Sequence, residues 1–370
     1  MKVLHFYKTA FPDSMGGVEQ VINQIARGSK KFGVETEVLS LTRDQQASTI
    51  EIDGYLTHRA SLDFQIASTG FSASAFLRFS KLAKQADVIH YHFPWPFMDV
   101  VHFVTNVKKP TVVSYHSDII KQRNLLKLYR PLKNKFLASV DRIVAASPNY
   151  LESSDVLKKF SDKVIVIPYG LDKTSYPTPT PQKLQYWRDK IGPKFFLFVG
   201  VLRYYKGLHI LMEAAQGVDY PVVIVGAGPI EAELKAQANK LGLRNIHFLG
   251  LLPDEDKVAL FTLCYGVLFP SHLRSEAFGI SLLEGAMFGK PMISSEIGTG
   301  TTFINISDET GLVIPPSDPD ALRQAMRYLW EHPEQAAEMG RNAEARYWKY
   351  FTAEDMVSAY IKLYRELTQK

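Results

Sequence analysis

Short apolar runs alternate with helical patterns throughout the first half of the chain. Val18, Val21, Ile22 and Ile25 recur at helical spacing and predict a helix after the first apolar run. Continuous apolar runs separated by helices are typical of parallel strands whose two faces are both buried. The pattern therefore predicts six parallel strands, at residues 2–7, 36–41, 87–93, 111–116, 142–147 and 163–170.

The same alternation starts again after an interruption. The stretch DKTSYPTPTPQKLQ, residues 172–185, holds three prolines within five residues. Because alternating proline can hold neither a helix nor a central strand, we expect a linker there. Six further apolar runs follow, with helical patterns between them, at residues 195–201, 221–228, 245–250, 266–271, 291–295 and 311–316.

This organisation predicts an α/β protein with two doubly wound, Rossmann-like domains. A chain of 370 residues is too long for one ordinary core and fits two cores. We expect a first domain over residues 1–170, a linker over 171–193, a second domain over 194–349 and a final helix over 350–370. That helix has an apolar stripe that must pack on another part of the protein, formed by Met356, Ala359, Tyr360, Leu363 and Leu367.

Composition narrows the class of protein further. No stretch approaches the roughly 20 apolar residues that span a bilayer, no signal peptide is recognisable, and the lone Cys264 is expected to be buried. We therefore expect a cytoplasmic protein. The net charge of +5 is uneven: residues 1–170 hold 22 Lys and Arg against 15 Asp and Glu, and residues 171–370 hold 21 against 23. No basic cluster is interleaved with stacking aromatics, so we expect no nucleic-acid partner.

The strongest chemical signal is SEAFGISLLEG, in which seven residues separate Glu276 from Glu284. A helix is expected to begin near Gly279, which places Glu276 in the loop after a strand, where open α/β sheets bind ligands. Both carboxylates can accept hydrogen bonds from sugar or ribose hydroxyls. The backbone N–H groups of Phe278, Gly279 and Ile280 favour an anion or a hydroxyl at the helix start. Alone, the motif would fit two solvated glutamates equally well.

A second signal is GVLRYYKG, directly after a predicted strand. Gly200 opens a strand-to-helix turn, and Arg203 and Lys206 follow within one turn of each other. Two cations beside a helix start suit a pyrophosphate, which needs positive charge when its bond to a sugar breaks. The same spacing is also common on protein surfaces.

The first domain contributes two weaker motifs. Gly16 and Gly17 let the backbone approach a ligand closely at the start of a helix, although a plain tight turn has the same pattern. His116 and Asp118 stand at the end of a predicted strand. A histidine there can hydrogen-bond a sugar hydroxyl, whereas a lone histidine is usually structural.

Three other patterns have simpler explanations than the sites that they resemble. VVIVGAGPIEAEL places Gly-x-Gly after a strand, but Glu231 stands where a dinucleotide-binding motif has its third glycine. Two D-x-D pairs precede helices, where capping favours acids, and we interpret them as caps rather than metal ligands. These are Asp254, Asp256, Asp318 and Asp320. We expect His90 and His92 to point to opposite faces of one strand and therefore not to share a metal ion.

The segment 121–140 combines apolar and basic positions and is expected to break or kink at Pro131. It fits a core-packing helix with a solvated basic face. It also fits a surface that docks on anionic lipid, where each basic residue contributes ~1 kcal/mol. Its apolar positions are Leu125, Leu126, Tyr129, Leu132, Phe136 and Leu137, and its basic positions are Lys121, Arg123, Lys127, Arg130, Lys133 and Lys135.

Together these motifs resemble glycosyltransferase family four, and the resemblance covers essentially the whole chain. The Glu-x₇-Glu pair after FPS, the G-x-L-x-x-x-K-G turn, VGAGP and TGLVIPPSDPDAL stand in the usual order of the family. The resemblance implies the GT-B fold, in which two Rossmann-like domains face a central cleft and the final helix crosses back to the first domain. It also implies that domain closure assembles the site.

The resemblance assigns roles to the matching residues. Glu276 and His116 correspond to the residues beside the donor sugar, Glu284 to the one that holds the ribose, and Lys206 to the diphosphate lysine. The glycine pair of the first domain corresponds to the loop that closes over donor and acceptor. The chain departs from the family at Val201, where arginine is usual, and we expect a nearby arginine, two residues on, to supply that charge.

The resemblance also implies a retaining transferase that uses no metal and no cofactor. In such enzymes the leaving phosphate accepts the proton of the attacking hydroxyl. The chain looks most like mannosyltransferases that build bacterial polysaccharides, such as O-antigen, from GDP-mannose on lipid-linked acceptors. Peripheral attachment to the cytoplasmic face of an anionic membrane is then an expectation. The alternatives are a transferase that uses a UDP-sugar, a GT-B epimerase or phosphorylase, and a non-catalytic protein that binds sugar nucleotides.

Overall fold

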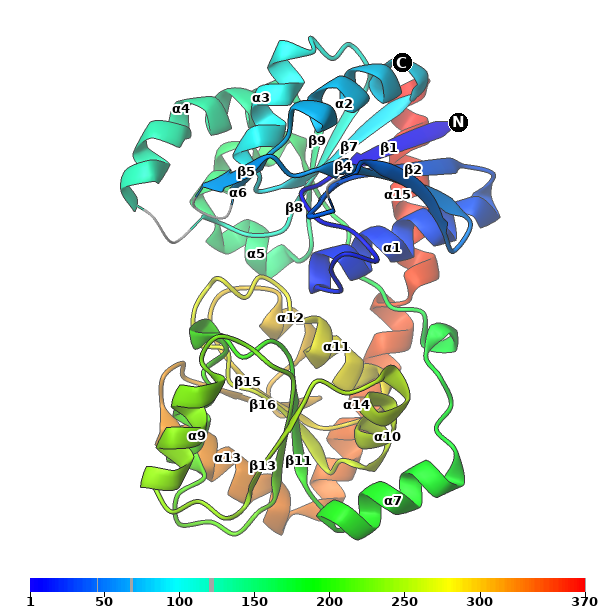
Figure 1. Cartoon of the computed structure of the whole chain (residues 1–370). Coiled ribbons are helices and arrows are strands. Elements are labelled where there is room, and N and C mark those ends of the chain that lie inside the picture. Colours follow the sequence, from blue (N-terminus) through cyan, green and yellow to red (C-terminus); the bar gives the residue numbers. More distant parts are fainter. Residues whose placement is uncertain (45, 67–68, 120–122, 370) are drawn as a thin grey trace. The chain divides into compact units, whose positions relative to one another are not determined.

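The computed structural model describes residues 1–44, 46–66, 69–119 and 123–369. They form two compact units, of which one contains Met1–Gly170 and Ala353–Lys370 and the other contains Leu171–Thr352. We call these unit 1 and unit 2. Each unit is a largely parallel sheet with helices packed on it, so the predicted α/β class with two Rossmann-like domains is confirmed (Figure 1).

Unit 1 contains an eight-stranded sheet with the order β10-β9-β8-β7-β1-β2-β4-β3. Neighbouring strands are parallel except β3 and β4, which are antiparallel. The strands are β1 (Lys2–Phe6), β2 (Glu35–Thr42), β3 (Ser48–Ile52), β4 (Tyr55–Ser61), β7 (Val88–Phe93), β8 (Thr111–Tyr115), β9 (Arg142–Ala145) and β10 (Val164–Val166); β5 (Phe64–Ile66) and β6 (Thr69–Phe71) form a separate hairpin. The six predicted strands are present. The sequence analysis missed β3 and β4 because their partly exposed residues give no continuous apolar run.

The C-terminal helix belongs to unit 1. α15 (Ala353–Thr368) packs against α1 (Gly17–Ser29), where a Cβ on Gly28 would lie 2.7 Å from Cγ2 of Val357 (Figure 1). Glycine at position 28 therefore permits the close approach of the two helices. The remaining helices of unit 1 are η1 (Lys30–Phe32), α2 (Ala73–Gln85), α3 (Pro96–Val104), α4 (Arg123–Ser139), α5 (Pro148–Ser153), α6 (Asp155–Lys159) and η2 (Ser161–Lys163).

Unit 2 contains a six-stranded, fully parallel sheet with the order β13-β12-β11-β14-β15-β16. Its strands are β11 (Phe196–Val199), β12 (Val222–Val225), β13 (Ile246–Gly250), β14 (Gly266–Phe269), β15 (Met292–Ser295) and β16 (Gly311–Ile314). All six were predicted from the sequence, and Cys264, just before β14, is buried as expected. Its helices are η3 (Lys173–Ser175), α7 (Pro181–Ile191), η4 (Tyr204–Lys206), α8 (Leu208–Ala214), α9 (Glu231–Lys240), α10 (Asp254–Leu263), α11 (Ile280–Met287), α12 (Thr301–Ile304), α13 (Pro319–Glu331) and α14 (Pro333–Tyr350).

The expected linker over residues 171–193 is part of unit 2 and contains the helix α7. Proline is compatible with a helix at its first position, which Pro181 occupies, and Thr180 caps the helix by accepting from the N–H of Lys183 at 3.2 Å. Trp187 is buried and donates from Nε1 to Oδ1 of Asp256 at 2.9 Å. The last of the three prolines therefore begins a helix that its buried tryptophan holds in place.

The basic amphipathic segment also differs from expectation. α4 is one continuous helix with Pro131 inside it, so of the expected break or kink at this proline the break is excluded. Lys133 is buried, and burial lowers its pKa, so this lysine does not belong to a solvated basic face. Lys121 lies outside the described residues, as do the side chains predicted at positions 123, 125 and 126.

Candidate functional site

Two loops at one edge of the unit 2 sheet carry the strongest motifs. β11 and β14 are parallel neighbours, so the loops that follow them leave the same edge. The first loop forms η4 and the second leads to α11. Gly207, with φ 72°, lies at the junction, and a Cβ there would stand 1.9 Å from the carbonyl oxygen of Pro270. Only glycine lets the two loops come this close.

The loops bring Lys206 and Glu276 together. Nζ of Lys206 donates to Oε2 of Glu276 in a buried ion pair, and Oγ of Ser271 donates to the same oxygen at 3.2 Å. The sequence analysis selected both charged residues from separate motifs and expected different roles for them. The other carboxylate oxygen, Oε1, has no hydrogen-bond partner in the described part of the chain and can accept one from a ligand.

The ion pair keeps Lys206 charged. Burial alone would lower the pKa of Lys206, but the charges of Glu276 and Tyr205 and the hydrogen bond to Glu276 together raise it. Nζ also lies 4.8 Å from the ring centre of Phe269 and 5.4 Å from that of Tyr205. The site therefore presents a fixed ammonium beside a fixed carboxylate in a largely desolvated place, where each can meet a polar group of a ligand.

Glu284 lies on α11 and is anchored by residues that the sequence analysis did not identify. The phenol of Tyr176 donates to Oε1 of Glu284 at 3.0 Å. Nζ of Lys257 lies 3.7 Å from the same oxygen and 2.9 Å from Oδ1 of Asp254. Tyr176 comes from the stretch expected to be a linker, and no spacing in the sequence links it to α11. Oε2 of Glu284 has no partner among the residues that the structure describes.

Burial is the main influence on Glu284. It raises the pKa of the carboxyl, and the charge of Lys257 and the hydrogen bond from Tyr176 oppose this rise in part. Burial and the neighbouring carboxylate also raise the pKa of Tyr176 well above its ordinary value, so the phenol stays a donor. Glu284 thus has one oxygen fixed by the protein and one available to a ribose hydroxyl.

The start of α11 lies between the two glutamates. Gly279 precedes the helix with φ 103°, and a Cβ on it would lie 2.9 Å from the ring of Phe269. The first N–H groups of a helix, here from Gly279 and Ile280, have no acceptor within the helix. The ring of Phe278 is 2% exposed and belongs to the core, so its contribution to a ligand would come from its backbone alone.

Arg203 is exposed, as is Val201 at 48%, whereas Leu202 between them is fully buried. The guanidinium of Arg203 has no hydrogen-bond or ion-pair partner among the described residues. It is therefore available to a ligand, and its role at a phosphate stays a prediction.

The VGAGP motif packs against the β11 loop. A Cβ on Gly226 would lie 2.0 Å from the carbonyl oxygen of Gly200, and one on Gly228 would lie 2.3 Å from that of Leu202. Leu202 also donates its N–H to the carbonyl of Ala227 at 3.0 Å. These glycines allow two loops to touch, which explains the Gly-x-Gly pattern without a dinucleotide.

In unit 1, His116 follows β8 and has both ring nitrogens occupied. Nε2 is 2.8 Å from Nδ1 of His92, and Nδ1 is 2.5 Å from the hydroxyl of Tyr169. Burial, with a smaller effect from Lys8, lowers the pKa of His116 to about 3, so the ring is neutral. A sugar hydroxyl can reach a ring nitrogen only by replacing one of these partners. Asp118 accepts from Ser154 at 2.8 Å and lies in a separate hydrogen-bond group.

The expectation for His90 and His92 was wrong. Residues two apart on a strand point to the same face, and these two rings stack with centres 4.4 Å apart. With His5 they form a buried group whose possible metal-ligand atoms all lie within 4.8 Å. The ring nitrogens of His90 already face Tyr364 at 2.6 Å and Ser114 at 2.8 Å. The group is thus a hydrogen-bonded cluster in which a metal ion would have to displace existing bonds.

The acidic pairs have protein partners. Asp318 caps α13 by accepting from the N–H of Ala321 at 2.9 Å, which confirms the capping interpretation for that residue. Asp320 pairs with an arginine one turn on, and Asp254 pairs with Lys257. Asp256 instead accepts from Trp187 and pairs with Lys183 at 2.9 Å, so its role is to hold α7.

Gly16 and Gly17 lie at the start of α1, as the sequence predicted. Neither has a positive φ, so the backbone shape alone does not require glycine. A Cβ on Gly16 would lie 2.5 Å from Oε2 of Glu19, which shows that this carboxylate folds over the helix start. An anion at this position would have to displace Glu19.

Comparison with known sequences identifies two family models on the chain. Residues 15–175 match Glycosyltransferase Family 4, and residues 184–346 match Glycosyl transferases group 1. The D-rhamnosyltransferase WbpZ of Pseudomonas aeruginosa is 67% identical over 95% of this chain and 93% of its own length. The O-antigen chain mannosyltransferase C of Escherichia coli is 51% identical over 100% of this chain and 99% of its own length.

Solved structures share the fold. A sucrose-phosphate synthase from Thermosynechococcus elongatus superposes with a TM-score of 0.82 at 20% identity, covering 99% of this chain and 98% of that one. WaaG, a glycosyltransferase involved in lipopolysaccharide biosynthesis, gives a TM-score of 0.72 at 18% identity over 100% of both chains. These likenesses identify the GT-B fold, as the motifs predicted.

Proposed function

This chain belongs to glycosyltransferase family 4, and from that premise we propose that it transfers a hexose of D-manno configuration from a GDP-linked donor to a lipid-linked glycan. The observation that carries the proposal is the buried ion pair of Lys206 and Glu276 beside the start of α11. A fixed cation next to helix N–H groups suits a diphosphate, and the adjoining carboxylate suits a sugar hydroxyl.

Unit 2 would bind the donor through four side chains and the first N–H groups of a helix. Lys206 and Arg203 would hold the diphosphate, with the N–H groups that begin α11 on its other oxygens. Oε2 of Glu284 would accept from a ribose hydroxyl, because Oε1 is already bound to Tyr176. Glu276 would accept from a hydroxyl of the transferred sugar through Oε1. In unit 1, His116 would contact the same sugar.

The reaction we propose retains the anomeric configuration. The bond between the anomeric carbon and the phosphate oxygen breaks, and the acceptor hydroxyl attacks that carbon from the same face. Its proton passes to the leaving phosphate, so no protein base is needed. Lys206 would stabilise the charge that develops on the phosphate, a contribution of about 3–4 kcal/mol for one well-placed donor. The proposal involves no metal ion and no cofactor.

Two sugars fit the relatives. D-rhamnose is D-mannose without its 6-hydroxyl, and the two similar transferases are named for one sugar each. The rhamnosyltransferase is 67% identical to this chain and the mannosyltransferase 51%. GDP-D-rhamnose is therefore a candidate donor beside GDP-mannose. Both names fit a role in polysaccharide synthesis, and that of the mannosyltransferase points to O-antigen.

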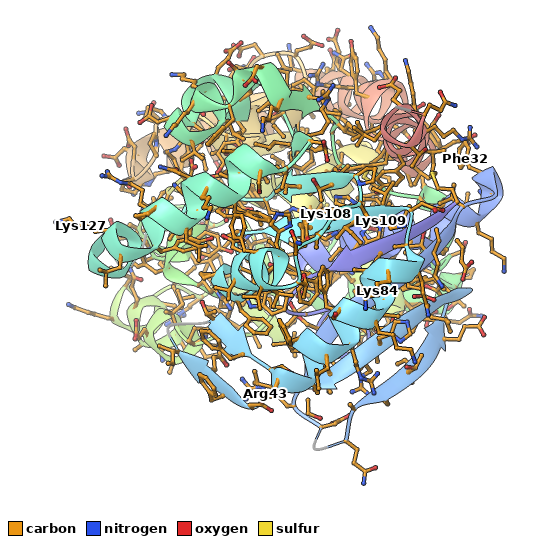
Figure 2. All side chains as sticks on the ribbon, turned by 90° about the horizontal axis from the view of Figure 1, so that it is seen from above. Phe32, Arg43, Lys84, Lys108, Lys109 and Lys127 are labelled. Atoms are coloured by element: carbon orange, nitrogen blue, oxygen red, sulfur yellow. The ribbon has the colours of Figure 1, made fainter. Side chains whose placement is uncertain are left out.

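We propose that unit 1 docks on the anionic cytoplasmic face of a membrane. No helix in the described ranges is long and apolar enough to cross a bilayer. Figure 2 shows basic residues spread over the face of unit 1 that it views, namely Arg43, Lys84, Lys108, Lys109 and Lys127. Phe64 and Ile66 of the β5–β6 hairpin are 55% and 58% exposed. Cosedimentation with anionic vesicles at low salt tests this, and K108E/K109E should weaken it; no cosedimentation would refute it.

The first experiment is the shift in melting temperature with GDP, UDP, ADP, CMP and NAD, each near millimolar. A ligand at a hundred times its Kd stabilises the folded state by about 2.7 kcal/mol, which is readily measured. A shift with GDP alone supports the proposed donor. Transfer assays with GDP-mannose and GDP-D-rhamnose on a lipid-linked acceptor then identify the sugar, and NMR of the product identifies its anomeric configuration.

Other outcomes would identify the alternatives. A shift with UDP or ADP but not GDP would keep the transferase and discard the GDP-linked donor. Release of nucleotide without transfer, or a requirement for inorganic phosphate, would indicate an epimerase or a phosphorylase. Binding without turnover, unchanged by alanine at Glu276, would indicate a protein that only binds sugar nucleotides. An inverted product would refute retention.

A further inference from the structure

Three buried imidazole rings of unit 1, those of His5, His92 and His116, form a single hydrogen-bonded chain. Nδ1 of His5 lies 2.9 Å from Nε2 of His92, and Nδ1 of His92 lies 2.8 Å from Nε2 of His116. The chain ends at the hydroxyl of Tyr169, 2.5 Å from Nδ1 of His116. His5 and His92 are completely buried and His116 is 5% exposed, so water does not supply alternative partners to the first two.

The chain forces the three rings to share one tautomer. Burial lowers the pKa of all three far below the ordinary histidine value, so each ring is neutral and has one N–H and one lone pair. Each contact joins Nδ1 of one ring to Nε2 of the next. If one ring carries its proton on Nδ1, the next must do the same, and likewise for Nε2.

One atom of His5 without a hydrogen-bond partner decides which nitrogen of each ring carries the proton. Nε2 of His5 is buried and has no hydrogen-bond partner in the described part of the protein. With protons on Nε2, this atom would be a buried donor without an acceptor, which is rare in native proteins. With protons on Nδ1, it is only a lone pair among packed rings. The Nδ1–H arrangement is therefore favoured.

We propose that His92 is a positioning residue that donates from Nδ1 to Nε2 of His116 and so holds His116 as the Nδ1–H tautomer. The N–H of His116 then points at the hydroxyl of Tyr169, and a sugar oxygen that displaces this phenol meets a fixed donor. The proposal rests on the proposed contact between His116 and the transferred sugar. Neither His5 nor His92 needs to touch the substrate.

His90 provides a matched control within the same cluster. It lies on β7 two residues before His92, is equally buried, and its ring stacks on that of His92. Its own nitrogens bind Tyr364 and Ser114 and make no hydrogen bond to His116. Replacing either ring by phenylalanine preserves an aromatic ring in the core, but only H92F removes a partner of His116.

The test combines kinetics with ¹⁵N NMR of the full-length, histidine-labelled protein. We expect His116 to be the Nδ1–H tautomer in the wild type and in H90F, and to lose this single form in H92F. We expect H92F to lower kcat by about 10- to 100-fold with little change in the KM of the donor, as for other residues that orient an active group. H92N, whose amide can still donate to His116, should recover part of the loss, and H90F should stay within about threefold of wild type.

Several outcomes would overturn the inference. These are a wild-type His116 protonated on Nε2, an unchanged kcat in H92F, an equal loss in H90F, or stoichiometric zinc in the purified protein, which would make the cluster a metal site. H116A separates this inference from the proposed function. If H116A remains fully active, the contact with the sugar fails; if H116A is inactive while H92F is active, only the role of His92 fails.

Discussion

The two carboxylates of unit 2 each have one oxygen bound to the protein. Oε2 of Glu276 is held by Lys206 and Ser271, and Oε1 of Glu284 is held by Tyr176. A buried carboxylate with no partner would be protonated or displaced, because desolvation of a lone charge is costly. These partners hold each glutamate in one orientation, and leave one oxygen of each for hydroxyl groups of a ligand.

Replacing Lys206 or Glu276 should separate nucleotide binding from transfer. K206M should lower kcat/KM by about 100- to 1,000-fold and markedly reduce the melting-temperature shift with GDP, because the diphosphate loses one of its two proposed cations. E276Q should lower transfer comparably but keep the shift with GDP, since GDP has no sugar for Glu276 to bind. Thermal shift and kinetics measure both effects. A K206M protein that binds GDP normally would contradict the diphosphate role.

Removing the phenol of Tyr176 should weaken the donor site through Glu284. The hydrogen bond from Tyr176 lowers the pKa of Glu284, so Y176F should raise that pKa further. Glu284 then gains its proton at a higher pH, and the acid limb of kcat/KM for the donor should move upward. At neutral pH we expect the KM of the donor to rise by about three- to tenfold, the value of one ordinary hydrogen bond. Y186F, at a tyrosine that is 52% exposed, is the control and should change neither quantity.

At the scale of elements, α7 shows how a segment with a loop-like composition becomes ordered. Its apolar content is low, and Trp187 is its buried residue. Lys183 and Trp187, one turn apart on α7, both bind Oδ1 of Asp256 on α10. A short helix is marginal in isolation, so these contacts to α10 decide that it forms.

The neighbouring aromatic residues of α7 should therefore differ sharply in their effect on stability. W187A removes a buried ring and a hydrogen bond and should lower the free energy of unfolding of unit 2 by about 3–5 kcal/mol. Y186A, at the adjacent exposed position, should change it by less than about 0.5 kcal/mol. Denaturant unfolding followed by circular dichroism measures the difference. If W187A changed the free energy of unfolding as little as Y186A, the packing of α7 would not contribute to the stability of unit 2.

At the scale of the whole molecule, the chain passes between its two units twice, after Gly170 and after Thr352. The first and last residues of unit 2 are hydrogen-bonded to each other. Leu171 pairs with Thr352 in an isolated parallel bridge and donates its N–H to the carbonyl of Phe351 at 3.0 Å. Tyr347 donates to the carbonyl of Leu171 at 2.9 Å. α15 then completes unit 1, where Tyr360 binds Ser114 and Tyr364 binds His90. α15 thus contributes two tyrosines to the polar core of unit 1 next to β7 and β8.

The buried histidines of unit 1 predict that stability falls as the solution becomes acidic. Burial lowers the pKa of His5 and His116 to about 3, whereas an unfolded histidine titrates near 6.5. Above that pH the rings are neutral in both states and the full stability is present. Below it the unfolded state binds protons that the folded state refuses, so the free energy of unfolding falls as the pH drops from 6.5 toward 3.

The size of this loss can be measured directly. Between pH 7.5 and 5.5 each buried histidine should remove about 1.4 kcal/mol, and His90 and His92 should act in the same direction. Urea unfolding at the two pH values measures the total loss of unfolding free energy. H90F should make this loss smaller by about the contribution of one histidine. A stability independent of pH over this range would contradict the prediction, because it would mean that the folded cluster takes up protons as readily as the unfolded chain.

The sequence by itself determined the α/β class, twelve parallel strands, the division near residue 170 and the charged residues of the candidate site. It could do so because continuous apolar runs and the Glu-x₇-Glu and Gly-rich motifs are local patterns. Tertiary structure alone decided which groups those residues meet. Three sets of contacts join distant segments: Lys206 with Glu276, Tyr176 with Glu284, and the hydrogen-bonded chain from His5 to His116. The expected orientation of His92 was wrong because residues two apart on a strand point to the same face, not to opposite faces. Partners that are far apart in sequence leave no local pattern, since only the fold brings them within hydrogen-bond distance.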